Sequence, residues 1–261
     1  MTDDVFTRSG GRPRRQQTVY VVLPAYNEES RIGQLLDRID TAMWEEGFSY
    51  RVIVIDDGSH DATVKIVQDY SSRMPIMLKR HDVNQGLGAA IRSGLIIAMG
   101  LAAARDIIVT MDADNTHTPG LIVHMVRMIR EGCDVVIASR YRPQSQTYGV
   151  PVMRRCISYA GSLLCRWVLP IQGVRDYTSG FRAYRADVLG GAVQQYGGDF
   201  LDQEGFQCMV DILFKLRRLR LIFGEVPMIL RYDLKHDASK MNVMKTARAT
   251  LLLLLKRRLG K

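Results

Sequence analysis

Five short apolar runs, rich in β-branched residues, constrain the fold of this 261-residue chain more than any other feature. The runs are Thr18–Leu23, Tyr50–Ile55, Ile76–Lys79, Ile107–Met111 and Asp134–Ala138. Continuous apolarity is typical of strands that are buried on both faces of a sheet. Amphipathic stretches with helical periodicity separate the runs, at Glu29–Trp44, Asp61–Ser71, Leu87–Ala103 and Pro119–Arg130. This alternation predicts an α/β fold with a mainly parallel central sheet flanked by helices.

The second half of the chain has a less regular pattern. We expect helices at Val152–Val168 and Leu201–Leu219, a loop and short strand at Asp176–Tyr184, a strand at Phe223–Leu230, and an amphipathic helix at 239–258. The chain then divides into three parts. These are a flexible basic tail at 1–17, one globular domain at 18–242, and a basic amphipathic C-terminal helix at 243–261.

The net charge of +9 gathers at the two ends of the chain. Four arginines against two aspartates give residues 1–17 a charge of +2, and six basic residues without an acid give residues 244–261 a charge of +6. The body therefore carries only +1. Because a nucleic-acid-binding domain carries its excess charge on the folded body, we expect no nucleic-acid partner. Basic ends fit peripheral contact with an anionic membrane surface, alongside the alternative that the C-terminal helix packs on the domain.

Neither a membrane span nor a secretion signal is expected. The longest run of bulky apolar residues is Leu251–Leu255, far short of a spanning helix, and residues 1–17 lack the apolar region of a signal peptide. The four cysteines form no CxxC pair, which indicates reduced core thiols in a cytoplasmic protein.

Polar residues follow every predicted strand, at the edge where parallel sheets bind ligands. Asp112 and Asp114 follow the fourth strand, and residues two apart on an extended chain point the same way. Two carboxylates there would hold Mg²⁺ or Mn²⁺ together with diphosphate oxygens. The competing interpretation is a capped turn, for which aspartates are also suited.

Other strand ends offer further candidates. Asp57 is a second aspartate beyond the one that helix capping needs, so it is a candidate to bind a base or ribose. The turn at Gly86–Gly88 either cradles phosphate or only permits close packing. Arg140, Arg142 and Arg182 are candidates to bind phosphate oxygens. The five histidines show no metal-ligand spacing, and no nucleophile motif is present.

Seven sequence blocks occur in an order that identifies a family. They are LPAYNEE (Leu23–Glu29), VIDDGS (Val54–Ser59), NQGLGAA (Asn84–Ala90), MDADNTHTP (Met111–Pro119), SRY (Ser139–Tyr141), DYTSGFRAY (Asp176–Tyr184) and EVPMILRYDLKHDASK (Glu225–Lys240). With them the chain resembles glycosyltransferase family 2, with its GT-A fold. Within that family it is most similar to dolichol-phosphate mannosyltransferase and other polyprenyl-phosphate glycosyltransferases.

The resemblance implies roles for individual residues. The nucleotide pocket would contain Pro24, Tyr26, Glu28, Ile55, Asp57, Asn84 and Ala113. The metal would be bound by Asp112, Asp114 and Thr116, and Asp112, Asp114 and Arg140 would form the catalytic group. The phosphate and acceptor site would contain Arg140, Arg182, Arg231 and Lys240. In the last block the family pattern Arg-x-x-Gly-x-Ser-Lys is altered, with Leu234 in place of Arg and Asp237 in place of Gly, so Arg231 or Lys235 would substitute.

The implied reaction is a metal-dependent, inverting transfer of a hexose from a nucleoside diphosphate sugar to a polyprenyl phosphate. GDP-mannose is the expected donor, so mannose is the expected sugar, with a UDP-hexose as the alternative donor. A second hypothesis is transfer to a saccharide or small molecule, which needs a general base, with Asp176 and Asp211 as candidates. A third is a basic membrane- or nucleic-acid-binding module without catalysis.

Overall fold

The computed structural model describes residues 16–168, 170–203 and 205–234, together with residues 249 and 252. Nearly all of the predicted basic tail at 1–17 lies outside this part of the chain. The same holds for Lys235, Lys240 and most of the predicted C-terminal helix at 243–261.

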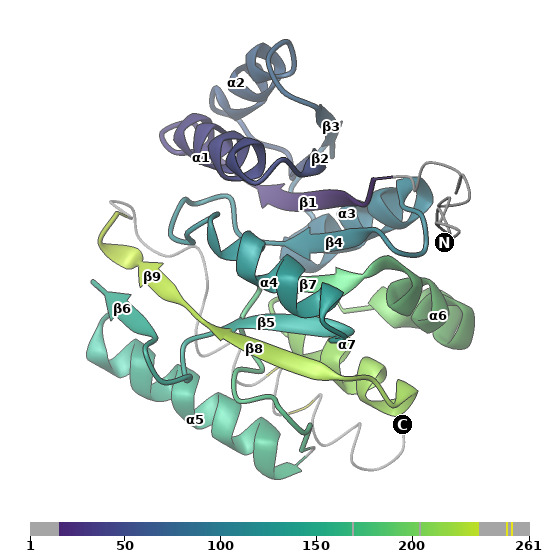
Figure 1. Ribbon diagram of the computed structural model, residues 1–261. Helices are drawn as coiled ribbons and strands as arrows, with labels where there is room; N and C mark the ends of the chain where they lie inside the picture. The colour runs from purple at the N-terminus through teal and green to yellow at the C-terminus, as the bar shows by residue number, and fades with distance from the viewer. Residues whose placement is uncertain (1–15, 169, 204, 235–248, 250–251, 253–261) are drawn as a thin grey trace, which may run out of the picture.

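A seven-stranded sheet in the order β3-β2-β1-β4-β7-β5-β8 forms the centre of the domain (Figure 1). Its strands are β1 Thr18–Ala25, β2 Ser49–Asp56, β3 Ile76–Arg80, β4 Ile107–Thr110, β5 Val135–Ser139, β7 Arg182–Arg185 and β8 Phe223–Pro227. All neighbouring pairs are parallel except the two made by β7, which runs antiparallel to both β4 and β5. The five strands predicted from apolar runs and the mainly parallel sheet are thus confirmed.

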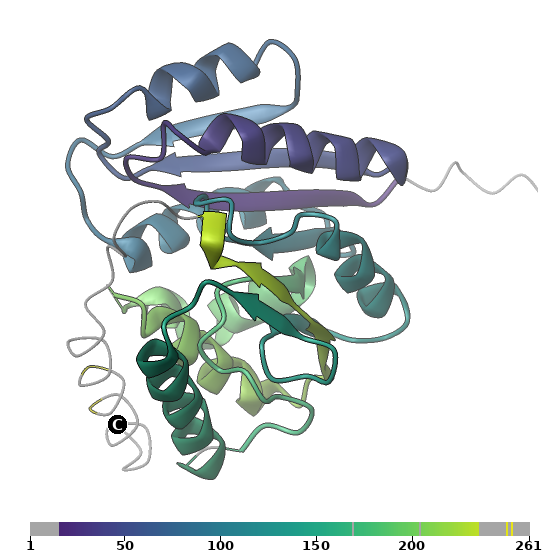
Figure 2. The same ribbon diagram turned by 90° about the vertical axis from the view of Figure 1, so that its left-hand side faces the viewer.

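Helices cover both faces of the sheet (Figures 1 and 2). They are α1 Ile32–Glu45, α2 Thr63–Tyr70, α3 Leu87–Leu101, α4 Leu121–Arg130, α5 Val152–Val168, α6 Ala186–Tyr196 and α7 Cys208–Leu216, with the short 3-10 helices η1 Gly197–Leu201, η2 Arg217–Leu219 and η3 Tyr232–Leu234. Alternate side chains of every strand of this sheet except β3 enter two separate apolar cores. One core packs against α3, α6 and α7, and the other against α1 and α4.

Three features of the second half differ from the sequence prediction. The helix expected at Leu201–Leu219 begins only at Cys208. Helix α6 was not expected, because Gly190 and Gly191 weaken its helical propensity. The strand expected at Phe223–Leu230 is two strands. Strand β8 ends at Pro227, which has no N–H for a sheet, and β9 (Ile229–Arg231) pairs with β6 (Gln146–Tyr148) in a separate two-stranded sheet.

The reversed direction of β7 has a consequence for the edge where the parallel strands end. The segment 176–181 that leads into β7 enters the sheet at this edge, between the ends of β4 and β5. The hydroxyl of Thr110 donates to the carbonyl of Gly180 over 2.8 Å, which fixes the segment to the end of β4. Among the described helices, none has the length and apolar character needed to cross a membrane.

Two glycines of α3 allow a matched test of how closely this helix packs on the sheet. A Cβ at Gly94 would lie 2.3 Å from Cγ1 of Val22, whereas a Cβ at Gly100 would meet nothing within 4 Å. We expect Gly94→Ala to lower the free energy of unfolding by about 1–3 kcal/mol through overpacking. Gly100→Ala should raise it by up to about 1 kcal/mol through helix propensity. Urea denaturation measures both, and equal effects would contradict the close packing at Gly94.

Candidate functional site

The carboxyl ends of the parallel strands bring most of the predicted site residues to one edge. Strands β1 and β2 end in register, with Ala25 beside Asp56, so the turns that follow them are neighbours. The turn after β4 carries Asp112 and Asp114 next to them, and Arg140 follows β5 across the segment that leads into β7. This is the ligand-binding edge of an open α/β sheet.

Asp57 organises the loop that precedes α3. One of its carboxylate oxygens accepts the N–H of Gln85 at 3.0 Å, and the other accepts the N–H of Gly86 at 2.8 Å. The first oxygen also lies 2.7 Å from Nδ1 of His81, whose Nε2 lies 2.9 Å from the hydroxyl of Ser93 on α3. Asp57 therefore fixes the backbone of the loop that presents the exposed side chain of Asn84.

The sequence reasoning missed His81 and Ser93. The five histidines show no metal-ligand spacing, and among them only His117 was predicted to lie near the site. Its position directly after β3, at the same edge as Asp57, was the available signal. The order Asp–His–Ser resembles a hydrolytic triad, but Ser93 lies within α3, where the backbone N–H groups around it serve the helix. The three residues thus position the loop.

The turn after β1 is held by the turn after β2. Asn27 has a left-handed backbone (φ 50°), and its side-chain oxygen accepts the N–H of His60 at 2.9 Å. Glu28 is buried beside Arg31, with 3.3 Å between the carboxylate and the guanidinium. Pro24 and Tyr26 are partly exposed, whereas the side chains of Ile55 and Ala113 are buried in the two cores.

Asp112 and Asp114 differ in their surroundings. The side chain of Asp112 is 41% exposed, and its carboxylate lies 3.9 Å from Nε2 of His117. Asp114 is buried, and one of its oxygens accepts both the hydroxyl of Thr116 at 2.7 Å and the N–H of Thr116 at 3.2 Å. A Cβ at Gly180 would lie 3.3 Å from Asp112, so the segment before β7 adjoins this turn.

The donor atoms of this turn are carboxylate and hydroxyl oxygens, which suit Mg²⁺ or Mn²⁺. Across the described ranges, no group of three or more His, Cys, Asp or Glu side chains forms a complete metal site. Two carboxylates would hold such an ion only if a ligand and water supplied the remaining oxygens. The residues therefore fit a metal that arrives with a diphosphate.

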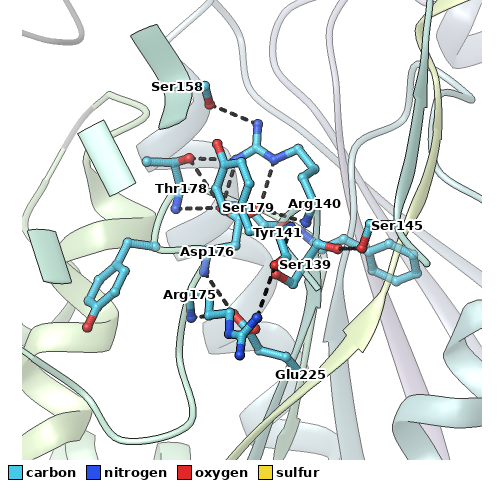
Figure 3. A network of polar contacts seen from close by, with 12 residues as sticks. Ser139, Arg140, Tyr141, Ser145, Ser158, Arg175, Asp176, Thr178, Ser179 and Glu225 are labelled. Atoms are coloured by element: carbon cyan, nitrogen blue, oxygen red, sulfur yellow. Dashed lines mark hydrogen bonds and ion pairs between the residues drawn. The ribbon is translucent and has the colours of Figure 1, made fainter. Parts of the chain in front are cut away.

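Arg140 is clamped by Asp176 in a network of polar contacts (Figure 3). The guanidinium donates to both carboxylate oxygens, at 2.8 Å from Nε and 2.7 Å from Nη2, and the backbone N–H of Arg140 adds a contact of 3.0 Å. Nη2 also donates to the hydroxyl of Thr178 at 2.6 Å, and Nη1 donates to the hydroxyl of Ser158 on α5 at 3.0 Å. Every guanidinium nitrogen thus has a partner.

Burial and the attraction between the two charges shift the pKa values of Arg140 and Asp176 in opposite directions. Burial lowers the pKa of Arg140, but the attraction of Asp176 outweighs it and raises the pKa above its ordinary value. Burial raises the pKa of Asp176, but Arg140 outweighs it, so the pKa lies below its ordinary value. The pair is therefore ionised throughout the physiological pH range.

Glu225 on β8 holds Asp176 in place. One oxygen of Glu225 accepts the backbone N–H of Arg175 at 2.6 Å and that of Asp176 at 2.8 Å (Figure 3). Burial raises the pKa of Glu225 above its ordinary value of 4.5. Glu225 and Ser158 were not among the predicted site residues, since neither lies near Arg140 in the sequence.

Arg182 and Arg231 were both predicted to bind phosphate, but their side chains lie in different surroundings. The side chain of Arg182 is fully buried, and its guanidinium donates to the carbonyls of Met209 at 2.5 Å and Tyr177 at 2.8 Å. The prediction of Arg182 as a phosphate ligand at the edge is therefore corrected, because β7 directs this side chain into the core. Arg231 has an exposed side chain that pairs with Asp233 at 2.8 Å, and its backbone N–H donates to the carbonyl of Thr116 at 2.9 Å.

The sequence of this chain is similar to those of known glycosyltransferases. The sequence profile of "Glycosyl transferase family 2" matches residues 20–191. A dolichol-phosphate mannosyltransferase of Pyrococcus furiosus is 34% identical over 210 residues, which are 80% of this chain and 55% of that protein. The chain thus spans about half the length of that relative. An undecaprenyl-phosphate mannosyltransferase of Micrococcus luteus is 33% identical over 210 residues, which are 80% of this chain and 82% of that protein.

A solved structure shares the fold. Glucosyl-3-phosphoglycerate synthase from Mycobacterium tuberculosis, crystallised with Mn²⁺, uridine diphosphate and phosphoglyceric acid, superposes with a TM-score of 0.63 at 20% identity. The match covers 93% of this chain and 78% of that one. The predicted GT-A fold is thereby confirmed.

Two Arg–Asp pairs of the same chemistry allow a test of the buried network. The side chains of Arg140 and Asp176 are 19% and 0% exposed, whereas those of Arg231 and Asp233 are 43% and 39% exposed. We expect Asp176→Asn to lower the free energy of unfolding by about 3–5 kcal/mol, because it leaves a buried guanidinium without its counter-charge. Asp233→Asn should have little effect. Chemical denaturation of both variants would refute the structural role of Asp176 if they proved equally stable.

Glu225 should give the stability a pH dependence of known sign. A carboxyl whose folded pKa is raised binds its proton more tightly in the folded state, so its ionisation costs stability as the pH rises above 4.5. Glu225→Gln keeps the oxygen that accepts the two N–H groups and cannot ionise. We expect it to be more stable than the unmodified protein near neutral pH, with a difference that shrinks as the pH falls toward 4.5.

Thermal unfolding over a pH series measures this difference. Glu225→Ala is the control, since it removes the acceptor and should be less stable at every pH. A difference between Glu225→Gln and the unmodified protein that grows toward acidic pH would contradict the raised pKa.

Proposed function

The chain belongs to glycosyltransferase family 2, and from this premise we propose that it transfers a hexose from a nucleoside diphosphate sugar to a polyprenyl phosphate. The relatives from Pyrococcus furiosus and Micrococcus luteus are named for mannose transfer to dolichol phosphate and undecaprenyl phosphate. Mannose, carried by GDP, is accordingly the proposed sugar. Membership in a family of transferases removes the hypothesis of a non-catalytic basic module.

One structural observation carries the choice of acceptor. A sugar hydroxyl needs a general base to attack, and the sequence offered Asp176 and Asp211 for that role. Asp176 is fully buried in its pair with Arg140, which holds its pKa below the ordinary value. Asp211 is 1% exposed and forms an ion pair with the buried Lys215. Neither carboxylate is placed to take a proton, whereas a phosphate monoester is already an anion and needs only positioning.

The donor would bind across the ends of β1, β2 and β4. We assign the base and ribose to the pocket of Pro24, Tyr26, Glu28, Asp57 and Asn84, with Ile55 and Ala113 contributing their backbone because their side chains lie in the cores. Asp57 would act there mainly by holding the loop that carries Asn84. The N–H groups of Gln85 and Gly86 are occupied by Asp57, so the loop would present the side chain of Asn84 to the donor in a fixed position.

Asp112 and Asp114 would hold the metal ion, and Thr116 orients Asp114 through its hydroxyl. When bound, Mg²⁺ or Mn²⁺ neutralises the negative charge that grows on the diphosphate as the bond to the sugar breaks. Arg140 is a fixed positive charge close enough to Asp112 to interact with it electrostatically. Attack by the lipid phosphate from the opposite side of the sugar would invert its anomeric carbon.

The acceptor phosphate needs cations that can reach it. The side chain of Arg231 is exposed on β9, which is bound to the metal-binding turn through the N–H of Arg231 and the carbonyl of Thr116. We propose Arg231 and Lys240 as acceptor ligands beside Arg140. The free thiols of the four cysteines agree with action at the cytoplasmic face of a membrane.

Asp114→Asn is the test of the catalytic assignment. We expect it to reduce transfer from GDP-mannose to undecaprenyl phosphate at least a hundredfold, because loss of a metal ligand removes several kcal/mol of transition-state stabilisation. Asp69→Asn, on the exposed surface of α2, is the matched control and should retain full activity. Circular dichroism and thermal unfolding check that both variants fold.

The donor and acceptor are tested separately. Thermal shift with GDP-mannose, UDP-glucose and UDP-N-acetylglucosamine in the presence of Mn²⁺ identifies the nucleotide, since the donor stabilises the folded state by mass action. Efficient transfer to a free saccharide with none to the lipid phosphate would overturn the proposed acceptor and favour the second hypothesis.

A further inference from the structure

Helix α5 is amphipathic, but its apolar side faces outward. Of its seventeen residues, only Ser162 and Cys165 are buried. Six of its large apolar side chains are exposed to solvent: Val152 by 73%, Met153 by 75%, Tyr159 by 53%, Leu163 by 50%, Leu164 by 37% and Trp167 by 77%. At about 100° per residue, these six side chains fall within an arc of roughly 140°. No charged residue lies inside that arc.

The opposite side of α5 meets the protein through Cys165, which is buried in the apolar core, and through polar contacts. Ser158 bonds to Arg140, and Arg154 donates to the hydroxyl of Tyr232 at 2.9 Å. Helices on the surface of a soluble domain normally bury their apolar stripe, so this arrangement is the reverse of the usual one. Both views show α5 at the outer margin of the molecule, remote from α1 and α2 (Figures 1 and 2). An exposed apolar stripe of this length indicates a partner.

We propose that the exposed face of α5, made by Val152, Met153, Tyr159, Leu163, Leu164 and Trp167, docks on the surface of an anionic lipid bilayer. Exposed Arg155 and Arg166 border the apolar stripe and would meet lipid headgroups while the stripe enters the acyl boundary. Tryptophan and tyrosine are the residues that favour this interface. Since α5 does not qualify as a spanning helix, it would lie in the plane of the membrane.

The positive charge of Arg155 and Arg166 argues against two other partners for the exposed face of α5. Residues 244–261 of the same chain carry six basic residues and no acid, so they would repel Arg155 and Arg166. A symmetric contact with a second copy would place the arginine border of one α5 near that of the other. A surface of anionic lipid matches both the apolar stripe and its basic border.

Docking through α5 has a direct connection to the site. Ser158 and Tyr159 are consecutive residues that point in different directions: the first bonds to Arg140, and the second belongs to the exposed face. Tyr159 also packs edge-on against Tyr141, with 5.4 Å between ring centroids. If the acceptor is the polyprenyl phosphate of the proposed function, docking would bring its phosphate to the Arg140 side of the edge. The docking itself rests on α5 alone.

Vesicle binding tests the proposal, with Trp44 as a matched control. Trp44 at the end of α1 is 79% exposed, nearly the same as Trp167 at 77%. With vesicles of phosphatidylcholine and phosphatidylglycerol that contain no polyprenyl phosphate, we expect the double variant Leu163→Ser, Trp167→Ser to bind at least tenfold more weakly than the unmodified protein. Trp44→Ser should bind as the unmodified protein does. Vesicles of phosphatidylcholine alone should bind at least tenfold more weakly than the mixed vesicles.

A second measurement leaves α5 unaltered. In Trp44→Ser the remaining tryptophan is Trp167, and its fluorescence should be quenched by mixed vesicles that contain brominated phosphatidylcholine. Absence of quenching, or equal binding of the double variant, would overturn the proposal. The proposal would also fail if sedimentation velocity showed that the unmodified protein is a dimer and the double variant is a monomer. Vesicle binding without any transfer activity would instead contradict the proposed function and leave the docking intact.

Discussion

The ion pair between Arg140 and Asp176 holds together the two halves of the edge at which the sheet ends. Arg140 follows β5, Asp176 precedes β7, and one oxygen of Glu225 on β8 fixes the backbone at Asp176. The pair is possible because β7 runs antiparallel between β4 and β5, which brings its leading segment to this edge. A buried guanidinium requires such a counter-charge, so the segment at 176–181 has one position in the folded protein.

The guanidinium groups of Arg140 and Arg231 differ in how firmly the structure holds them. Arg140 has every guanidinium nitrogen occupied and acts as a permanent charge of fixed position. The exposed guanidinium of Arg231 pairs with the neighbouring Asp233 and lies 5.7 Å from the ring centroid of Tyr148, and an exposed ion pair of this kind can exchange its partner for a ligand at little cost. In the proposed function, Arg140 would offer the acceptor phosphate a charge of fixed position, and Arg231 would exchange Asp233 for that phosphate.

The sequence was sufficient for the elements whose signal is local. Continuous apolar runs identified β1 to β5, and the turn residues after them identified the edge that carries Asp57, Asp112 and Arg140. It was insufficient wherever a role depends on distant pairing. Arg182 reads as a surface arginine, yet the antiparallel direction of β7 turns it into the core. His81 and Glu225 acquire their partners only when strands far apart in sequence become neighbours.

The small sheet of β6 and β9 lies outside the main sheet, but it is hydrogen-bonded to the turn that carries Asp112 and Asp114. The N–H of Arg231 donates to the carbonyl of Thr116, and Thr116 in turn donates its hydroxyl to Asp114. Movement of β6 and β9 would therefore be transmitted through Thr116 to the carboxylate of Asp114. If an acceptor and a cation bind as proposed, the occupancy of each site would change the affinity of the other by the same factor.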